Sequence, residues 1–323
     1  MGTYNVQLEV DMKTVDIVVP CYNEQEVLNM FYEESEKVIS TLSDYTFTYI
    51  FVNDGSTDDT LKIMKDFAAR HNNVKYVSFA RNFGKEPAMY AGLCNSKGDY
   101  VIVMDADLQH PPALIPKMLE KIGEGYDSCA TMRKSRKGEP KIRAGFASIF
   151  YKLSNKFSDV RLQQNSQDFR IMSRQMVDAV LRLTENQRFS KGIFAWVGFD
   201  TAWIEHTDVE RPAGTTKWNF KGLVKYAILG VTSFSTAPLR LLTTSGVFFA
   251  IIAALLIIVT IVRKLAFGIN VSGFATMLIA ILFIGGIIEI SLGIIGEYIA
   301  NIYIESKNRP LYIVKDSNID DAK

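Results

Sequence analysis

Short apolar runs alternate with longer amphipathic stretches along the first part of the chain. The runs are rich in Val, Ile and aromatic residues and predict β-strands, at residues 16–20, 47–53, 74–79, 100–104 and 128–132. The stretches between them predict helices, at residues 24–42, 57–70, 86–96 and 112–122. Ser56-Thr-Asp-Asp59 resembles a capping box that would open the second helix. Because apolar strands alternate with helices, the pattern predicts an α/β fold, a mostly parallel sheet with helices on both faces.

The pattern changes at Leu241, where 22 residues without a charge begin. Arg263 and Lys264 end this run, and residues 265–288 are again uncharged. About 20 apolar residues are enough for a helix to cross a ~30 Å hydrocarbon core, so we expect two transmembrane helices within residues 241–304. Residues 218–240 predict an amphipathic helix at the membrane surface, with apolar positions at near-helical spacing beside a basic stripe. The remaining segments are an N-terminal domain at 1–217 and a tail at 305–323.

The distribution of charge gives the orientation in the membrane. Basic residues are more frequent before the first span and after the second than in the loop between them, at Lys217, Lys221, Lys225 and Arg240 and at Lys307, Arg309 and Lys315. The positive side of a membrane protein is cytoplasmic, so we expect a multi-pass protein of the cell membrane whose N-terminal domain and tail are cytoplasmic. The polar first 13 residues show no signal peptide.

Composition excludes several other classes of protein. Lys and Arg number 36 against 35 Asp and Glu, and a net charge of +1 gives no general attraction to nucleic acid. Three scattered cysteines indicate neither a disulfide framework nor a zinc site. No G-x-G-x-x-G follows the first strand and no G-x-x-x-x-G-K-[ST] is present, which disfavours dinucleotide oxidoreductases and P-loop enzymes.

Acidic residues follow three of the predicted strands. Glu24 comes after the first, Asp54 after the second, and Asp105 and Asp107 after the fourth. In parallel sheets, ligands bind outside the carboxyl ends of the strands, so these side chains should share one edge. Carboxylates gathered there repel one another unless a cation offsets them. Asp105-x-Asp107 therefore suits a hard divalent cation that holds a diphosphate.

Several segments together resemble family 2 glycosyltransferases, whose catalytic domain has the GT-A fold. They are Val18-Val-Pro-Cys-Tyr-Asn-Glu24, Val52-Asn-Asp-Gly-Ser-Thr-Asp-Asp-Thr60, Arg81-Asn-Phe-Gly-Lys85 and Asp105-Ala-Asp-Leu-Gln109. The resemblance is greatest to the polyisoprenyl-phosphate branch, which includes bactoprenol glucosyltransferases and dolichyl-phosphate mannose synthases. It covers nearly the whole chain, the two C-terminal spans included.

This resemblance implies a role for each matching residue. The nucleotide pocket would comprise Pro20, Tyr22, Glu24, Val52 and Asp54. Asp105 and Asp107 would hold Mg²⁺ or Mn²⁺ with the diphosphate, while the donor site would include Ala106, Gln109 and Arg133. For Arg133, a solvated basic turn is an equally good interpretation. His110 receives no catalytic role.

Two later segments complete the implied site. Gln167-Asp168-Phe169-Arg170 resembles the segment that carries the family's catalytic carboxylate, although Asp168 could instead only pair with Arg170. Arg211-Pro-Ala-Gly-Thr-Thr-Lys217 resembles the loop that binds the lipid phosphate, with Thr216 where relatives often have Ser. Arg and Lys on either side of a glycine can enclose a phosphate, but such a loop could also bind the membrane surface in general.

The resemblance therefore implies an enzyme that transfers a sugar, with inversion, from a nucleotide-sugar to polyprenyl (undecaprenyl) phosphate. The donor is expected to be UDP-glucose or another UDP-hexose, and the product would serve cell-envelope glycosylation. The resemblance also implies a homo-oligomer, in which Glu289 and Glu297 are candidate contacts. One alternative is a processive polysaccharide synthase, for which a Q-x-x-R-W motif and further spans would be expected. Another is a non-catalytic membrane scaffold, which the complete set of Asp105, Asp107 and Asp168 disfavours.

Overall fold

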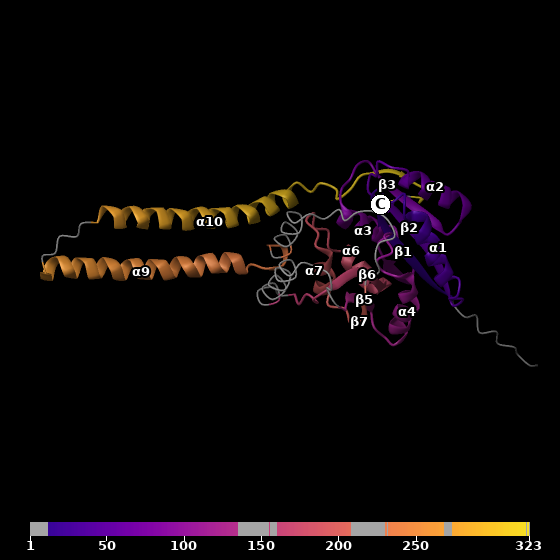
Figure 1. Cartoon of the computed structure of the whole chain (residues 1–323), viewed down its shortest axis with the longest axis horizontal. Coiled ribbons are helices and arrows are strands. Elements are labelled where there is room, and N and C mark those ends of the chain that lie inside the picture. The colour runs from indigo at the N-terminus through magenta and orange to yellow at the C-terminus, as the bar shows by residue number, and fades with distance from the viewer. Residues whose placement is uncertain are drawn as a thin grey trace, which may run out of the picture.

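An eight-stranded sheet forms the centre of the domain that precedes two long helices (Figure 1). The computed structural model describes residues 12–134, 155, 160–207, 230, 232–267, 273–320 and 322. The strands lie in the order β7-β5-β6-β4-β1-β2-β3-β8. Their bounds are β1 (Lys13–Cys21), β2 (Tyr45–Asn53), β3 (Val74–Phe79), β4 (Tyr100–Val103), β5 (Ser128–Arg133), β6 (Ser166–Ser173), β7 (Thr201–His206) and β8 (Val314–Ser317).

The sheet is mostly parallel, as the sequence predicts. β1 pairs in parallel with both β2 and β4, β2 pairs in parallel with β3, and β5 does so with β7. β6 lies antiparallel between β4 and β5, and β8 is antiparallel to β3 at the edge. Because β6 runs in the opposite direction, its first residues lie at the edge where β4 ends. This reversal brings the Ser166–Asp168 segment beside the carboxyl end of β4.

Helices cover both faces of the sheet, because side chains of successive strand residues point to opposite faces. Val15, Ile17 and Val19 of β1 face a core shared with α1 (Leu28–Ile39), α2 (Thr60–Arg70) and α4 (Ile115–Gly123), which a short 3-10 turn at Pro112–Leu114 precedes. Val18 faces the second core, which α3 (Lys85–Cys94), α6 (Arg174–Leu181) and α7 (Ser190–Trp196) cover. The α/β architecture with helices on both faces is therefore confirmed.

The capping box predicted at Ser56–Asp59 is wrong, because the structure shows neither the expected helix start nor a side-chain capping bond from the N-cap residue. α2 begins at Thr60, and its N-cap residue Asp59 makes no side-chain capping bond. Ser56 Oγ instead accepts a hydrogen bond from the backbone N–H of Asn23, at 2.9 Å. The hydroxyl thus joins two loops at the carboxyl edge of the sheet.

The C-terminal tail returns to the sheet, so the chain ends beside β3 (Figure 1). β8 pairs with β3 from Val77 opposite Ser317 to Phe79 opposite Val314. The ring of Tyr312 stacks on that of Phe79, with centroids 4.7 Å apart. The tail predicted at 305–323 thus supplies an edge strand of the catalytic domain.

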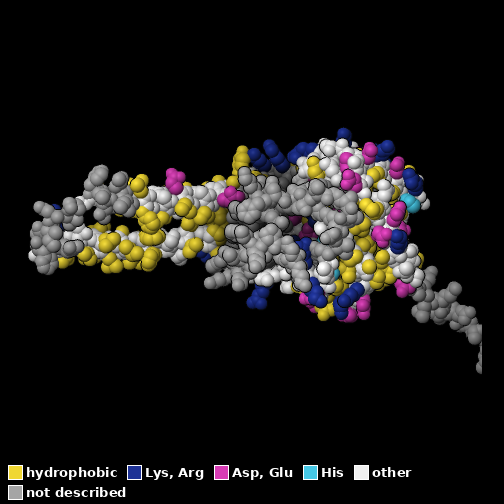
Figure 2. Space-filling view, in the orientation of Figure 1, with side chains coloured by type: hydrophobic (Ala, Val, Ile, Leu, Met, Phe, Trp, Pro, Cys, Tyr) yellow, Lys and Arg dark blue, Asp and Glu magenta, His cyan; other side chains and the backbone are white. Residues whose placement is uncertain are grey.

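The two long helices are α9 (Ala237–Phe267, 31 residues) and α10 (Phe274–Ser306, 33 residues). Both are long and apolar enough to cross a membrane, and the protein buries none of their most apolar 18-residue windows. Figure 2 shows hydrophobic side chains along both helices, whereas Lys, Arg, Asp and Glu gather on the domain that holds the sheet. α10 continues well past Ile288, so Glu289 and Glu297 lie within the helix.

Polar contacts join the end of α10 to the catalytic domain and to the segment that precedes α9. Glu305 Oε1 accepts the backbone N–H of Asn186 at 2.8 Å. Tyr298 donates its hydroxyl to the carbonyl oxygen of Ser235 at 2.7 Å. These bonds fix the helix against the segments just before α7 and just before α9.

Candidate active site

The loops after β1 and β2 form one side of the site and are bound to each other. The backbone N–H of Thr57 donates to Asn23 Oδ1 at 2.8 Å, and that of Asp54 donates to the carbonyl of Cys21 at 2.9 Å. Gly55 has φ +65°, and a Cβ there would lie 2.3 Å from the carbonyl carbon of Arg81. Only glycine allows this approach of the loops after β2 and β3. The predicted nucleotide residues from the two strand ends therefore share one edge, namely Pro20, Tyr22, Glu24, Val52 and Asp54.

The buried carboxylate of Asp54 organises the loop that follows β3. It accepts backbone N–H groups from Phe83 at 2.6 Å and Gly84 at 2.9 Å, and the side-chain amide of Asn82 at 2.9 Å. Burial raises the pKa of Asp54, while the two backbone donors act in the opposite direction. In this structure, Asp54 thus fixes the position of the residue that follows Gly84, which is Lys85.

Asp105 and Asp107 follow β4, as predicted. Ala106 between them is buried, and Asp107 Oδ1 accepts the backbone N–H of Gln109 at 3.1 Å. Leu108 has φ +56°, a conformation that costs free energy for a residue with a branched side chain. Strain of this kind is common at functional sites, and here it lies directly beside Asp107.

Lys85, the first residue of α3, connects two of the predicted carboxylates. Its Nζ lies 2.8 Å from Asp105 Oδ1 and 2.6 Å from Asp168 Oδ2. The pairing of Val103 with Arg170 in β4 and β6 explains why residues so distant in sequence meet. Burial alone would lower the pKa of Lys85, but the two carboxylates outweigh it and raise the pKa above its usual value.

Further basic side chains surround Asp168. Burial alone would raise the pKa of Asp168, but Lys85, Lys191 and Arg170 hold it well below its usual range. The side chain of Lys191 donates to the carbonyl of Ser166 at 2.7 Å. The guanidinium of Arg170 lies 3.9 Å from the ring centroid of Phe194, and burial lowers its pKa to about 10 although Asp168 opposes this. Asp168 is therefore an anion of fixed position, and Lys85 and Lys191 are its cationic neighbours in addition to Arg170.

The ends of β5 and β7 complete this edge. The backbone N–H of Arg133 donates to the carbonyl of Asn165 at 3.0 Å, which holds the end of β5 near the start of β6. Gln167 Oε1 lies 2.6 Å from His206 Nε2. The rings of His110 and His206 meet edge to face, with centroids 5.3 Å apart. Arg133 thus lies on the same edge as Asp105 and Asp168.

The carboxylates fit a hard divalent cation, which prefers oxygen ligands. Among the residues that the structure describes, no three His, Cys, Asp or Glu side chains gather as a complete metal site. Oxygens of Asp105 and Asp168 nevertheless converge on one cationic nitrogen. Mg²⁺ is usually held by one or two carboxylates together with substrate phosphates and water. The donor set suits a cation whose coordination the substrate completes.

Sequence reasoning found the carboxylates but missed Lys85, Lys191 and His206. The Arg81–Lys85 segment was the only signal for Lys85, since it matches a family motif. Arg211 and Lys217, and the interfacial segment up to residue 229, lie outside the described residues. Their predicted contacts with lipid remain predictions.

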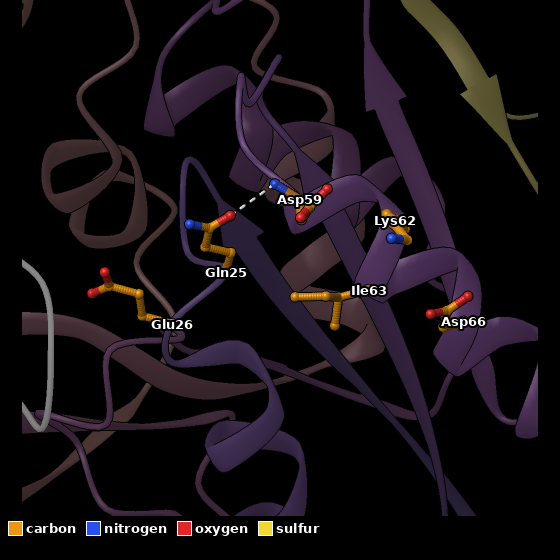
Figure 3. Close-up of a pocket in the computed structure, with 6 residues that line it drawn as sticks. All are labelled: Gln25, Glu26, Asp59, Lys62, Ile63 and Asp66. Atoms are coloured by element: carbon orange, nitrogen blue, oxygen red, sulfur yellow. Dashed lines mark hydrogen bonds between the residues drawn. The ribbon is translucent and has the colours of Figure 1, made fainter.

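A separate depression of about 480 Å³ lies between the start of α1 and the face of α2 (Figure 3). Its residues are Gln25, Glu26, Asp59, Lys62, Ile63 and Asp66. Gln25 Oε1 accepts the backbone N–H of Asp59 there, at 3.0 Å. None of the predicted donor or metal residues lines it, so we assign the site to the carboxyl edge of the sheet.

Comparison with known proteins gives the family. The profile of glycosyl transferase family 2 matches residues 16–181, and that of the GtrB C-terminal hairpin matches residues 237–302. The chain belongs to glycosyl transferase family 2, and it is a glycosyltransferase of the kind that carries this hairpin.

Similar proteins cover almost the full length. CsbB of Bacillus subtilis, named as a glycosyltransferase, is 46% identical over 94% of this chain and 92% of its own. The SfII prophage-derived bactoprenol glucosyl transferase of Shigella flexneri is 43% identical over 94% and 98%. Among solved structures, glucosyl-3-phosphoglycerate synthase of Mycobacterium tuberculosis covers 68% of this chain and 78% of its own, with 18% identity and a TM-score of 0.44. So distant a likeness carries no argument about function.

Proposed function

We propose that this enzyme transfers one hexose from a nucleotide-sugar, UDP-glucose or another UDP-hexose, to polyprenyl phosphate at the cytoplasmic face of the cell membrane. The observation that carries the proposal is the meeting of Asp105 and Asp168 at one sheet edge, in a chain that also has two membrane-length helices. Similarity to bactoprenol glucosyl transferases over 94% of the chain supports a polyprenyl phosphate acceptor. The product would be a lipid-linked sugar for cell-envelope glycosylation.

The donor would lie across the carboxyl edge of the sheet. Pro20, Tyr22, Glu24, Val52 and Asp54 would surround the nucleotide, and Ala106, Gln109 and Arg133 would line the diphosphate and sugar. Asp105 and Asp107 would hold Mg²⁺ or Mn²⁺. The bound cation would supply charge neutralisation for the departing diphosphate, which is the usual contribution of metals in such reactions.

The acceptor phosphate would attack the anomeric carbon from the side opposite the diphosphate. A single displacement of this kind inverts the anomeric configuration. A phosphate monoester is already largely ionised at neutral pH, so Asp168 is needed less to remove a proton than to orient the reacting groups. Its pKa, held well below the usual range, keeps it anionic for that purpose. Arg211 and Lys217 would hold the lipid phosphate by charge-assisted hydrogen bonds.

The membrane arrangement and assembly follow from the same proposal. Two crossings by α9 and α10 would leave the catalytic domain and the tail on one side, and the basic flanking residues favour the cytoplasm. The segment at 218–240 would lie in the headgroup plane and bring the acceptor loop to the lipid. A homo-oligomer, with Glu289 and Glu297 at its contacts, remains part of this proposal.

The test is transfer from a panel of nucleotide-sugars. Full-length protein in detergent is incubated with undecaprenyl phosphate, Mg²⁺ and one of UDP-glucose, UDP-galactose, UDP-N-acetylglucosamine or GDP-mannose. Mass spectrometry of the extracted lipid should find one hexose added from a UDP-hexose. If no donor modifies the lipid, the proposal is wrong and a non-catalytic scaffold gains support.

A further inference from the structure

Lys85 occupies an unusual position, because one ammonium group joins two carboxylates that come from different strands. Asp105 follows β4 and Asp168 belongs to β6, and both are partly shielded from solvent, with side chains 27% and 20% exposed. Without a cation between them, two such carboxylates would repel each other. Lys85 therefore offsets the repulsion between these two carboxylates.

The residues immediately before and after Lys85 in the chain are both held by hydrogen bonds to other parts of the protein. The residue before it, Gly84, has φ +106° and donates its N–H to Asp54. The residue after it, Glu86, accepts the hydroxyl of Ser190 and its backbone N–H, the latter at 3.1 Å. α3 thus starts at a defined point with its first side chain aimed at the two carboxylates.

The arrangement has a consequence for any divalent cation that uses Asp105. The ammonium of Lys85 lies 2.8 Å from Asp105 Oδ1 and 2.9 Å from Asp105 Oδ2, so it engages both oxygens that a metal ligated by Asp105 would use. A metal at this carboxylate would therefore compete with the ammonium for the same oxygens. Two or three carboxylates alone offer Mg²⁺ or Mn²⁺ few ligands, whereas a diphosphate adds oxygens and negative charge.

We propose that Lys85 is a built-in counter-cation that competes with the metal, so that the metal binds tightly only together with the nucleotide diphosphate. The ammonium acts on the metal through Asp105 and Asp168, and Lys85 is therefore a positioning residue. Its flexible four-carbon stem allows the ammonium to leave when metal and diphosphate enter together. This inference rests on the proposed function only in assuming that Asp105 is a metal ligand and that a nucleotide diphosphate binds here.

The experiment measures Mn²⁺ binding directly, with no sugar transfer. Full-length protein in detergent is titrated with Mn²⁺, alone and with saturating UDP, and free Mn²⁺ is followed by electron paramagnetic resonance. For wild type, we expect UDP to tighten Mn²⁺ binding at least ~10-fold. Lys85→Met and Lys85→Gln should bind Mn²⁺ without UDP at least ~10-fold more tightly than wild type, because the loss of a charge-assisted contact is worth about this much. The UDP effect should shrink accordingly.

Two further variants separate competition from general electrostatics. Lys85→Arg retains a cation and should bind Mn²⁺ without UDP as weakly as wild type. Lys191→Met removes one positive charge near Asp168, but its ammonium bonds to the Ser166 carbonyl and should alter the Mn²⁺ affinity less than ~3-fold. Thermal unfolding of each variant establishes that it is folded, and the Gln variant serves if the Met variant is not.

The inference is overturned if folded Lys85→Met or Lys85→Gln binds Mn²⁺ without UDP no more tightly than wild type. It is also overturned if Lys191→Met tightens binding as much as they do. The measurement is independent of the transferred sugar, because wild type and variants are compared without nucleotide. If transfer to the lipid fails while Lys85 still controls Mn²⁺ affinity, the proposed function is wrong and this inference stands. The reverse result rejects the inference alone.

Discussion

Individual residues at the carboxyl edge are held in place by contacts with neighbouring side chains of the protein. Asp168 is the clearest case, since Lys85 bonds to it at 2.6 Å and cationic neighbours depress its pKa. The sequence left open that Asp168 pairs only with Arg170, and the bond to Lys85 rules this interpretation out. A carboxylate in this setting is an anion of defined position.

Asp168→Asn should lower kcat and kcat/KM together by at least ~10²-fold and leave donor affinity nearly unchanged. The amide keeps the shape but removes the charge, and an interaction made mainly in the transition state has this kinetic signature. Single-turnover transfer and donor calorimetry on the same protein provide the measurement. Asp178→Asn is the matched control, because Asp178 pairs with Arg174 on the exposed side of α6. A defect confined to donor binding would remove Asp168 from the catalytic residues.

Gly55→Ala tests the close approach of the loops at the same edge. The new Cβ would lie 2.3 Å from Arg81 carbonyl carbon, at a residue with φ +65°, and we expect a loss of about 1–3 kcal/mol in the free energy of unfolding. Gly123→Ala is the control, because no atom lies within 4 Å of its Cβ and it ends α4. The midpoint of thermal unfolding in detergent should fall for the first variant only. Equal midpoints would mean that the loops can separate freely.

At the scale of elements, strands β1 to β4 could be predicted because each is rich in Val, Ile or aromatic residues, and β5 because its Cys-Ala-Thr-Met segment is largely apolar. β6 escaped prediction because five of the eight residues in its sequence, Ser-Gln-Asp-Phe-Arg-Ile-Met-Ser, are polar or charged. β8 has only four residues, two of them charged, and its strand character depends on pairing with β3. Lys85 was missed for a related reason. Its partner Asp168 lies 83 residues away, and no local pattern reports such a contact.

The tail strand should stabilise the loop that leads to Lys85. The backbone N–H of Ala80 donates to the carbonyl of Ile313 at 2.9 Å, and Tyr312 stacks on Phe79. Tyr312→Ala should therefore cost about 1–3 kcal/mol of stability through lost packing. Ile313→Ala is the control, because the Ile313 side chain is 54% exposed and its carbonyl is retained. Chemical denaturation followed by fluorescence compares them, and equal midpoints would show that β8 contributes little.

At the scale of the whole molecule, one polypeptide joins the proposed donor site to a hairpin of two helices long enough to cross a membrane. α10 is fixed to the catalytic domain through Glu305 and to the segment before α9 through Tyr298, and the chain then continues into β8. The hairpin is thus bound to the sheet through side-chain contacts and through the tail. Such an enzyme can bring an acceptor that stays in the lipid to a donor that arrives from water.

Arg211→Ala and Lys217→Ala should weaken use of polyprenyl phosphate far more than nucleotide-sugar binding. Loss of a hydrogen bond to a charged group costs about 1.5–3 kcal/mol, or roughly 10- to 150-fold in acceptor affinity. Acceptor dependence of transfer and donor calorimetry distinguish the two effects. Lys62→Ala, in the depression on α2, is the basic control and should behave as wild type. Equal losses for donor and acceptor would assign the loop to the nucleotide instead.

The most direct test of the central claim is the lipid product formed by metal-stripped protein from UDP-hexose and undecaprenyl phosphate. With Mg²⁺ restored, wild type should add a single hexose of inverted anomeric configuration, as mass spectrometry and nuclear magnetic resonance would report. With excess EDTA, or with folded Asp107→Asn in Mg²⁺, the lipid should remain unmodified. Full turnover in EDTA, free hexose beside unmodified lipid, or a chain of several hexoses would each contradict single, metal-assisted transfer at this edge of the sheet.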